Sequence, residues 1–181
     1  MKKIKLTIAV LAMATMTFAQ QAAKKEQDKE ISNAEKFSER SGTLIQKEFV
    51  DIGDIKKCKI QISKYTDLIS GQKSSAVRFE LEYQSSYSSD TKVAILDADE
   101  IEGLMKSIKI IQDKVFPTNA TNYTEVNFRS RSGFQAGCFS KKDSWSTFMK
   151  LEKFDSNSYV FMDKEDLTKL YSLLEQAKAK L

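Results

Sequence analysis

The sequence contains no histidine among its 181 residues. Histidine is the commonest general base near neutral pH and the commonest side-chain ligand of transition metals. Its absence excludes catalytic triads of the Ser-His-Asp and Cys-His kinds. Histidine-free enzymes exist that use paired carboxylates or a serine–lysine dyad, so the absence makes an enzyme less expected without excluding one. Ser70 and Lys73 have the spacing of such a dyad, but the companion motifs of penicillin-recognising enzymes are missing.

Proline and glycine are also scarce, with one and six residues, whereas aromatic residues make up 10% of the chain. A sequence with few chain breakers and many large apolar side chains is expected to form an ordered globule. Without a short N-terminal segment, the remaining roughly 160 residues fit one domain or two small units that share a core.

Long apolar runs are confined to the start of the chain. Leu6–Met16 is mostly apolar, follows the basic residues Lys2, Lys3 and Lys5, and precedes a small-x-small site that ends at Ala19. This pattern predicts a secretory signal peptide that is cleaved after Ala19. The alternative, an uncleaved membrane anchor, needs about 20 apolar residues, roughly twice the length present. We therefore expect a bacterial protein that works in the periplasm or outside the cell and has no integral membrane segment.

Once that segment is removed, neither positive nor negative charge is in clear excess. The whole chain has 29 basic and 25 acidic residues, and three of the lysines lie in the signal peptide. The remaining 26 basic residues nearly balance the 25 acidic ones. The net charge therefore does not favour a nucleic-acid or an anionic-membrane partner.

Residues 20–41 are charged and nearly free of large apolar side chains. Ile31, Ala34 and Phe37 recur on one side at helical spacing. This segment is predicted to be either a polar linker or a loosely docked helix.

Strand patterns begin after this segment. Four strands are predicted, at Thr43–Val50, Lys57–Tyr65, Ser75–Tyr83 and Lys92–Leu96. In the second of them alternate residues are apolar, so Lys59, Gln61 and Ser63 are predicted to lie on the face opposite the core.

A run of three carboxylates marks the change from strand to helix. Asp97, Asp99 and Glu100 follow the fourth strand, and apolar residues then recur at helical spacing until Pro117 stops the pattern. Asp97 with Glu100 three positions later predicts a capping box, in which both side chains accept from backbone N–H groups. Asp99 adds negative charge where the helix dipole favours it. A metal or catalytic cluster is the alternative, but no calcium-binding loop pattern follows these residues.

The same pattern recurs 66 positions later, where Asp163 precedes a second helical pattern. Strands of this second half are predicted at Tyr123–Ser130 and Phe134–Lys141. The sequence therefore predicts an α+β fold of two tandem ββββα units, residues 42–117 and 118–181. Each antiparallel sheet is predicted to be packed by a helix, with a pseudo-twofold axis relating the units. An acidic cluster copied together with its scaffold favours helix capping at both sites over catalysis.

The only two cysteines, Cys58 and Cys138, both lie in the predicted second strand of their unit. Export would permit a disulfide between them. Closing a loop of about eighty residues would stabilise the fold by roughly 4–5 kcal/mol. The alternative is two separately buried thiols that act as small apolar side chains.

Basic and aromatic residues alternate around one turn of the second unit. Arg129 and Arg131 precede the turn at Gly133, and Phe134 follows it. Together with Tyr87 in the first unit, these side chains are candidates for binding a flat ring or an anionic group. The alternative is a hairpin whose aromatic side chains face the core while its arginines are solvated.

Two successive units of four strands and a helix over residues 42–181 resemble, in element order alone, the tandem folds of the Whirly and PUR type. That resemblance implies binding of single-stranded nucleic acid, which the charge balance does not support. The chain also resembles uncharacterised secreted bacterial proteins that carry such repeats behind a signal peptide, and this second resemblance implies no activity.

These patterns lead us to expect an exported, non-enzymatic binding or interaction module without a cofactor or a metal ion. Its partner is expected to be a protein or a small ligand. A histidine-free hydrolase that uses carboxylates and a single-stranded nucleic-acid binder remain the alternatives.

Overall fold

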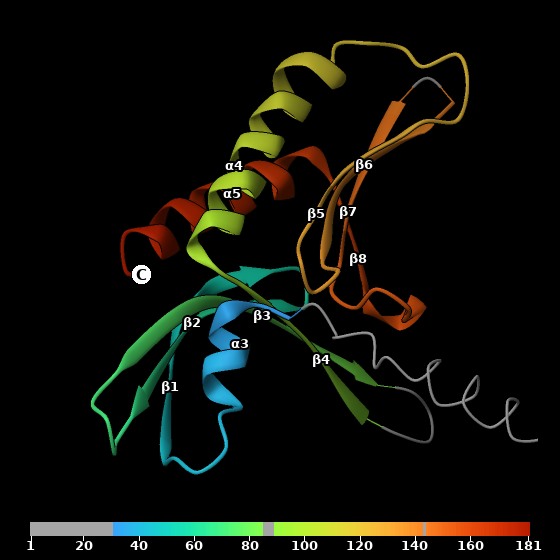
Figure 1. Ribbon diagram of the computed structural model, residues 1–181. Coiled ribbons are helices and arrows are strands. Elements are labelled where there is room, and N and C mark those ends of the chain that lie inside the picture. Colours follow the sequence, from blue (N-terminus) through green and yellow to red (C-terminus); the bar gives the residue numbers. More distant parts are fainter. Residues whose placement is uncertain (1–30, 85–88, 143) are drawn as a thin grey trace, which may run out of the picture.

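The computed structural model describes residues 31–84, 89–142 and 144–181. In these residues the chain forms two four-stranded antiparallel sheets and three α-helices (Figure 1). The α+β class and the antiparallel sheets predicted from the sequence are confirmed.

The elements follow one another as a short helix, then four strands and a helix, then four strands and a helix. The first half consists of α3 (Asn33–Ser38), β1 (Ile45–Ile55), β2 (Cys58–Asp67), β3 (Lys73–Gln84), β4 (Ser89–Leu96) and α4 (Ala98–Ile110), which continues as a π-helical turn (Ile111–Val115). The second half consists of β5 (Glu125–Arg129), β6 (Gln135–Lys141), β7 (Ser144–Lys150), a 3₁₀ turn η2 (Ser156–Ser158), β8 (Tyr159–Met162) and α5 (Lys164–Lys178). Within each sheet, strands that are consecutive in the chain are also neighbours in space.

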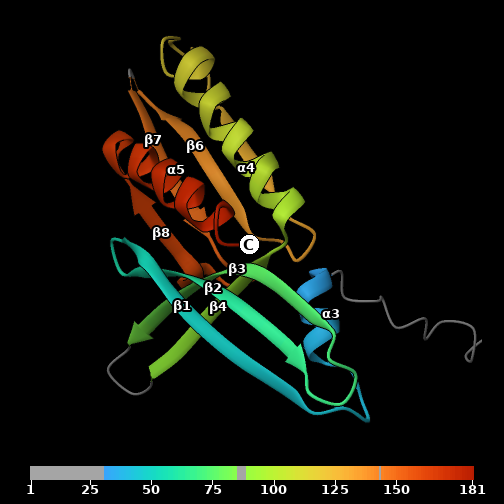
Figure 2. The same cartoon turned by 90° about the vertical axis from the view of Figure 1, so that its left-hand side faces the viewer.

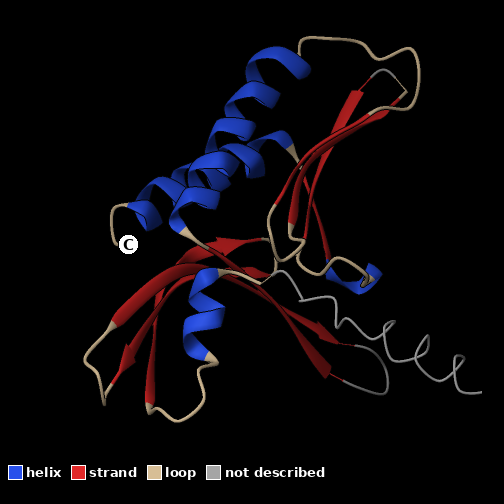
Figure 3. Ribbon diagram, in the orientation of Figure 1, coloured by secondary structure: helices blue, strands red, loops and turns tan. Residues whose placement is uncertain are grey.

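The two long helices pack together in the angle between the two sheets. Figures 2 and 3 show α4 and α5 side by side, on one face of each sheet. A single buried cluster contains the inward side chains of both sheets, such as Phe79 and Met149, and those of both helices, such as Leu104 and Leu170. The two halves of the chain therefore share one core.

Each sheet is packed by a helix as predicted, and each helix in addition contacts strands of the other sheet. Helix α5 packs closely on β1: a Cβ atom at Gly53 would lie 2.9 Å from Leu173 Cδ2. Helix α4 packs closely on β5: a Cβ atom at Gly103 would lie 3.1 Å from Phe128 Cε2. Each half of the chain therefore completes the packing of the other half.

The opposite face of the first sheet is covered by the short helix α3 (Figure 1). The helix begins with a capping box, in which Glu35 N–H donates to Ser32 Oγ at 3.1 Å and Ser32 N–H donates to Glu35 Oε2 at 3.0 Å. A second, smaller buried cluster joins its side chains to the sheet: Ala34, Phe37, Tyr65, Ala76 and Ile95. Within the described part of the predicted linker or helix, Asn33–Ser38 forms a docked helix, and residues 20–30 lie outside the described residues.

This cover changes the surroundings of β2. Ser63, predicted to lie opposite the core, does so but is fully buried, and Gln61 is buried as well. Ser63 pairs with Ala76, which packs in the cluster under α3. Gln61 instead bonds to the side chains of Asp51 and Arg78 on the neighbouring strands. A period of two in the sequence identifies the core face of a strand, but it does not show whether a second layer covers the other face.

Candidate functional site

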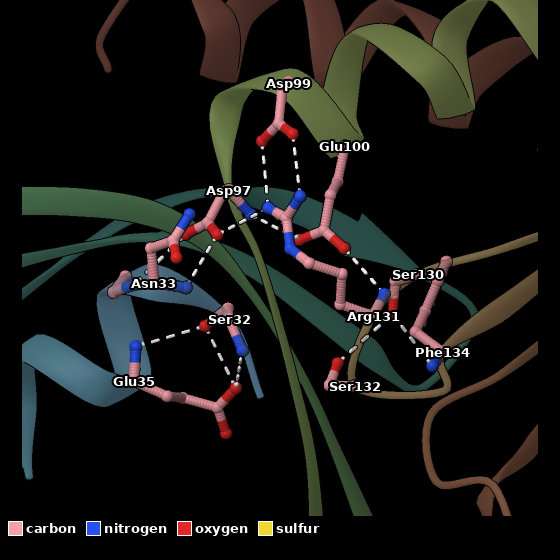
Figure 4. Close-up of polar contacts among 11 residues, drawn as sticks. Ser32, Asn33, Glu35, Asp97, Asp99, Glu100, Ser130, Arg131, Ser132 and Phe134 are labelled. Atoms are coloured by element: carbon pink, nitrogen blue, oxygen red, sulfur yellow. Dashed lines mark hydrogen bonds and ion pairs between the residues drawn. The ribbon is translucent and has the colours of Figure 1, made fainter. Parts of the chain in front are cut away.

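The turn between β5 and β6 places Arg131 against the start of α4 (Figure 4). Arg131 Nη2 lies 2.6 Å from Asp97 Oδ2 and 3.2 Å from Glu100 Oε2, and Arg131 Nη1 lies 2.7 Å from Asp99 Oδ2. The backbone N–H of Arg131 also donates to Glu100 Oε1 at 2.7 Å. The hydrogen bond to Asp99 lowers the pKa of that carboxyl and raises the pKa of the guanidinium. All three carboxylates of the predicted cluster thus share one cationic partner.

Asp97 connects three parts of the molecule. It is the residue before α4, and Glu100 Oε2 accepts from its backbone N–H at 3.0 Å. The Asp97 carboxylate accepts from the N–H groups of Asn33 (2.7 Å) and Ala34 (3.1 Å) at the start of α3. The sequence predicts capping by this side chain, but it gives no sign that α3 is the helix that receives it. Asp97 therefore holds α3, the start of α4 and Arg131 together.

The start of α5 is built in a related way. Asp163 precedes this helix, and its Oδ1 accepts from the Asp166 N–H at 2.8 Å. Lys56, in the turn between β1 and β2, places its Nζ 3.1 Å from Asp163 Oδ2 and 2.6 Å from Asp166 Oδ2. The hydrogen bond from the Asp166 N–H, followed by the Lys56 ammonium, lowers the pKa of Asp163.

The two acidic clusters have the chemistry of structural anchors. Asp97 and Glu100 are buried beneath Arg131, so a substrate would have to displace an ion pair to reach them. Within the described residues, no group of three or more His, Cys, Asp or Glu side chains is arranged to hold a metal ion. Asp163 caps its own helix, whereas the Asp97 carboxylate makes no cap hydrogen bond to α4 and accepts instead from the start of α3.

The four candidate binding residues differ in how exposed they are and in what they contact. Phe134 is fully buried, with its ring centroid 4.8 Å from that of Phe79, so it cannot stack on a ligand. Arg131 is engaged in the ion pairs at the start of α4. Arg129 is exposed at the end of β5, whereas Tyr87 lies outside the described residues. The turn itself is therefore used mainly to join the second sheet to the first half of the chain.

Both cysteines are buried free thiols. Cys58 faces the core from β2 and Cys138 faces it from β6, so each acts as the small apolar side chain of one alternative. The disulfide of the other alternative is not formed in the structure. Burial raises the pKa of the Cys58 thiol to about 12 and that of Cys138 to about 11. Neither thiol is therefore prepared to act as a nucleophile.

A group of four aromatic side chains, two of them exposed, lies on the outer face of the second sheet, which points away from α4 and α5. It consists of Phe139 on β6, Phe148 on β7, and Tyr159 and Phe161 on β8. Neighbouring ring centroids are 5.6 to 6.4 Å apart, and the rings of Tyr159 and Phe161 are parallel to within 5°. We call these four residues the aromatic face.

One part of the aromatic face is buried and ordered, and another part is exposed to solvent. Phe148 is only 4% exposed because its neighbours surround it, whereas Phe161 is 64% exposed. Lys150 Nζ lies 4.8 Å from the centroid of the Tyr159 ring, within the range of a cation–π contact. Aromatic side chains held rigidly by their neighbours lose little conformational entropy when a partner binds.

The aromatic face was not among the residues singled out from the sequence. In β8, Tyr159 and Phe161 alternate with Val160 and Met162, which face the core, so apolar side chains occupy both sides of the strand. Such a strand is typical of a sheet that is buried on both faces. The signal in the sequence was a strand that is apolar on both sides. That no second layer among the described residues covers this strand becomes visible only once the layers of the fold are known.

A second surface feature is an open groove of about 360 Å³ between α4 and α5. Its basic side chains are partly engaged within the protein: Lys178 pairs with Glu102 at 2.7 Å, and Lys109 lies 4.9 Å from the centroid of the Tyr171 ring. The groove therefore offers less free binding capacity than the aromatic face.

Comparisons of this chain with protein-family models, with curated proteins and with solved structures find no match. In the part of the chain that the structure describes, no helix has both the length and the apolar character that crossing a bilayer requires. The functional interpretation therefore depends on the geometry of this molecule alone.

Proposed function

We propose that the protein is an exported, non-enzymatic binding module that holds its partner on the aromatic face. The observation that carries this proposal is the largely exposed Phe161 ring within an ordered cluster of rings. A contiguous apolar patch on the surface of a folded protein commonly marks an interaction site. Aromatic side chains also contribute most to the affinity of protein interfaces.

The proposal assigns the acidic clusters to the scaffold. The carboxylate-hydrolase alternative needs an accessible acid, whereas Asp97, Asp99 and Glu100 all pair with Arg131. The nucleic-acid alternative needs free cations along a binding groove, and Arg131 is engaged in these same pairs. The aromatic face is therefore the better candidate for a binding site.

We further propose that the two halves are copies of one ββββα unit, related by a pseudo-twofold axis. Reciprocal contacts support this proposal. Lys56, between the first two strands of the first sheet, reaches the start of α5, and Arg131, between the first two strands of the second sheet, reaches the start of α4. The close approaches at Gly53 and Gly103 are reciprocal in the same sense.

Export is proposed from the sequence of the first 19 residues, as argued above. Intact-mass measurement on protein recovered from the periplasm and from the medium tests it. The expected mass corresponds to a chain that begins at Gln20. Recovery of the chain only from the cytoplasm, with its first 19 residues intact, would contradict export.

Photo-crosslinking tests the binding function of the aromatic face. We expect p-benzoylphenylalanine in place of Phe161 to form covalent adducts on irradiation in cells that produce the protein. The matched control is the same substitution at Phe154, which is 91% exposed in the loop before η2 and lies outside the aromatic face. Adducts at position 161 but not at 154 would support the proposal. Equal adduct yields, or none at position 161, would overturn it.

A further inference from the structure

We propose that the occupant of the aromatic face is a second copy of this chain, which packs its own aromatic face against the first in a twofold-symmetric dimer. This inference rests on the proposed binding function of the same surface and names the partner. Three observations carry it: the missing cover on the second sheet, the arrangement of charge around the rings, and the exposure of Phe161 in the middle row.

The described chain supplies an outer cover for the first sheet only. Helix α3 precedes β1 and buries Phe37 against the outer face of that sheet. The corresponding segment before β5, residues 117–124, is short and mostly polar, and no helix is formed there. Among the described residues, α3 thus covers Tyr65 on the outer face of the first sheet, although Phe49 on the same face stays 48% exposed, whereas no helix covers the rings on the second sheet.

Charge is distributed unevenly along the strands of the second sheet. Arg129 and Lys150 lie in one row across the sheet, because both pair with Gln135 in the strand register. The middle row contains Phe148 and Phe161, which pair with each other. At the other end of β5 lies Glu125. Along β5 the face therefore carries Arg129 at one end and Glu125 at the other, while Lys141 on β6 lies beyond Phe139 at the Glu125 end.

This distribution makes the face complementary to itself. Two identical stacked sheets can be related by a twofold axis that runs either along the strands or across them. An axis along the strands places the basic row of one copy over the basic row of the other. An axis across the strands, through the middle row, places Arg129 of each copy over Glu125 of the other copy. Opposite charges thus select the second arrangement.

The same axis also determines which rings meet. Because an axis across the strands keeps each strand over its own counterpart, the middle-row residue Phe161 of one copy faces Phe161 of the other. Phe161 is 64% exposed, whereas Phe148 in the same row is only 4% exposed within one copy. The exposed ring of Phe161 is therefore the part of the middle row that a second copy covers.

Sedimentation equilibrium of the purified protein across concentrations tests the dimer. We expect the wild-type chain to show a monomer–dimer equilibrium. Phe161→Lys should weaken the dimer by at least about a hundredfold, because it places two cations in the apolar centre. Phe154→Lys adds the same charge outside the face and should leave the equilibrium unchanged. Circular dichroism establishes that both variants remain folded, as expected for side chains with large exposed fractions.

Charge reversal tests the direction of the axis. Glu125→Arg or Arg129→Glu alone should weaken the dimer by about tenfold, because each creates two like-charge contacts. The double variant with both reversals should recover nearly the wild-type dissociation constant, since the pairs between copies are then restored with opposite sign. A double variant that is weaker than either single one would overturn this arrangement.

The remaining outcomes separate this inference from the proposed function. A chain that stays monomeric at all concentrations, but still forms adducts with another protein or with nucleic acid at position 161, overturns the dimer and leaves the binding function intact. A dimer that Phe161→Lys does not weaken also overturns the inference. Such a dimer would use another surface, for example edge-to-edge pairing of β5 strands, which leaves Phe161 outside the contact. A chain that neither dimerises nor forms adducts overturns both proposals.

Discussion

The starts of α4 and α5 are each held by a basic side chain from a turn of the other half of the molecule, but their surroundings differ. At α4 the carboxylates of Asp97 and Glu100 are buried, and Asp97 also caps α3. At α5 the pair between Lys56 and Asp163 lies at the surface. The start of α4 therefore connects three segments of the chain, whereas the start of α5 connects two.

The comparison shows that the same arrangement, acidic residues at a helix start paired with a basic side chain, can contribute very different amounts to the free energy of unfolding. A buried carboxylate that loses its partner keeps the cost of its desolvation, so breaking such a pair is expensive. An exposed pair gains little, because water solvates both groups well when they separate. Substitutions at the two starts should therefore differ in effect, although the sequence pattern at both is alike.

The largest effect is expected from Arg131→Met, which keeps the length of the side chain but removes the cation. Asp97 and Glu100 would remain buried without their partner, and we expect a loss of about 3 kcal/mol in the free energy of unfolding. Urea denaturation measures this loss. Lys169→Met, at an exposed site of α5 away from the aromatic face, is the control and should change stability by less than about 0.5 kcal/mol. Equal effects of the two substitutions would show that the cluster at α4 is no more important than the surface.

An intermediate effect is expected from Asp97→Ala, which removes the acceptor of the Asn33 and Ala34 N–H groups. Loss of a helix cap costs about 1–2 kcal/mol, and here the capped helix is α3. Hydrogen exchange should therefore become faster in α3 than in the sheets. The matched substitution Asp163→Ala should leave exchange in α3 unchanged. If α3 is equally protected in both variants, Asp97 does not hold it.

The smallest effect is expected from Lys56→Met, which removes the exposed cation at α5. The pKa of Asp163 lies below the ordinary 3.8, so its contribution to stability is present above that pH and is lost as the pH falls through the lowered pKa. Hydrogen bonds to Asp166 and Asp163 raise the pKa of Lys56 above the ordinary 10.5, so its contribution is lost only as the pH rises through the raised pKa.

The stability difference between wild type and Lys56→Met should therefore be largest between about pH 5 and pH 10 and should disappear in acid. Thermal unfolding at a series of pH values measures it, and added salt should reduce it. A difference that persists below pH 2 would mean that Lys56 acts through packing instead of charge.

The features that depend on neighbouring positions in the chain could be predicted from the sequence. Alternation in Ser75–Tyr83 is sufficient to identify β3, because a strand has a period of two whatever its neighbours are. The change to helical spacing after Leu96 identifies α4, and Pro117 marks its end. The order of strands and helices along the chain follows from such local patterns.

The features that depend on distant positions could not be predicted. Arg131 meets Asp97 across 34 positions, and no local pattern distinguishes it from Arg129, whose side chain is exposed. Phe134 and Phe161 are both aromatic residues near turns, yet one is buried and the other is exposed. Which layers cover a sheet decides these outcomes, and the sequence of a single strand does not contain that information.

The packing of α5 on β1 has a consequence for the order of events during folding. Ser75 Oγ donates to the carbonyl of Leu181 at 3.1 Å, so even the last residue contacts the first sheet. The earliest strand cannot bury its inner face until the final helix has left the ribosome, and a core closed by contacts so distant in the chain forms slowly. Delayed closure of this kind leaves the apolar inner face of β1 open during synthesis, when it can associate with other chains.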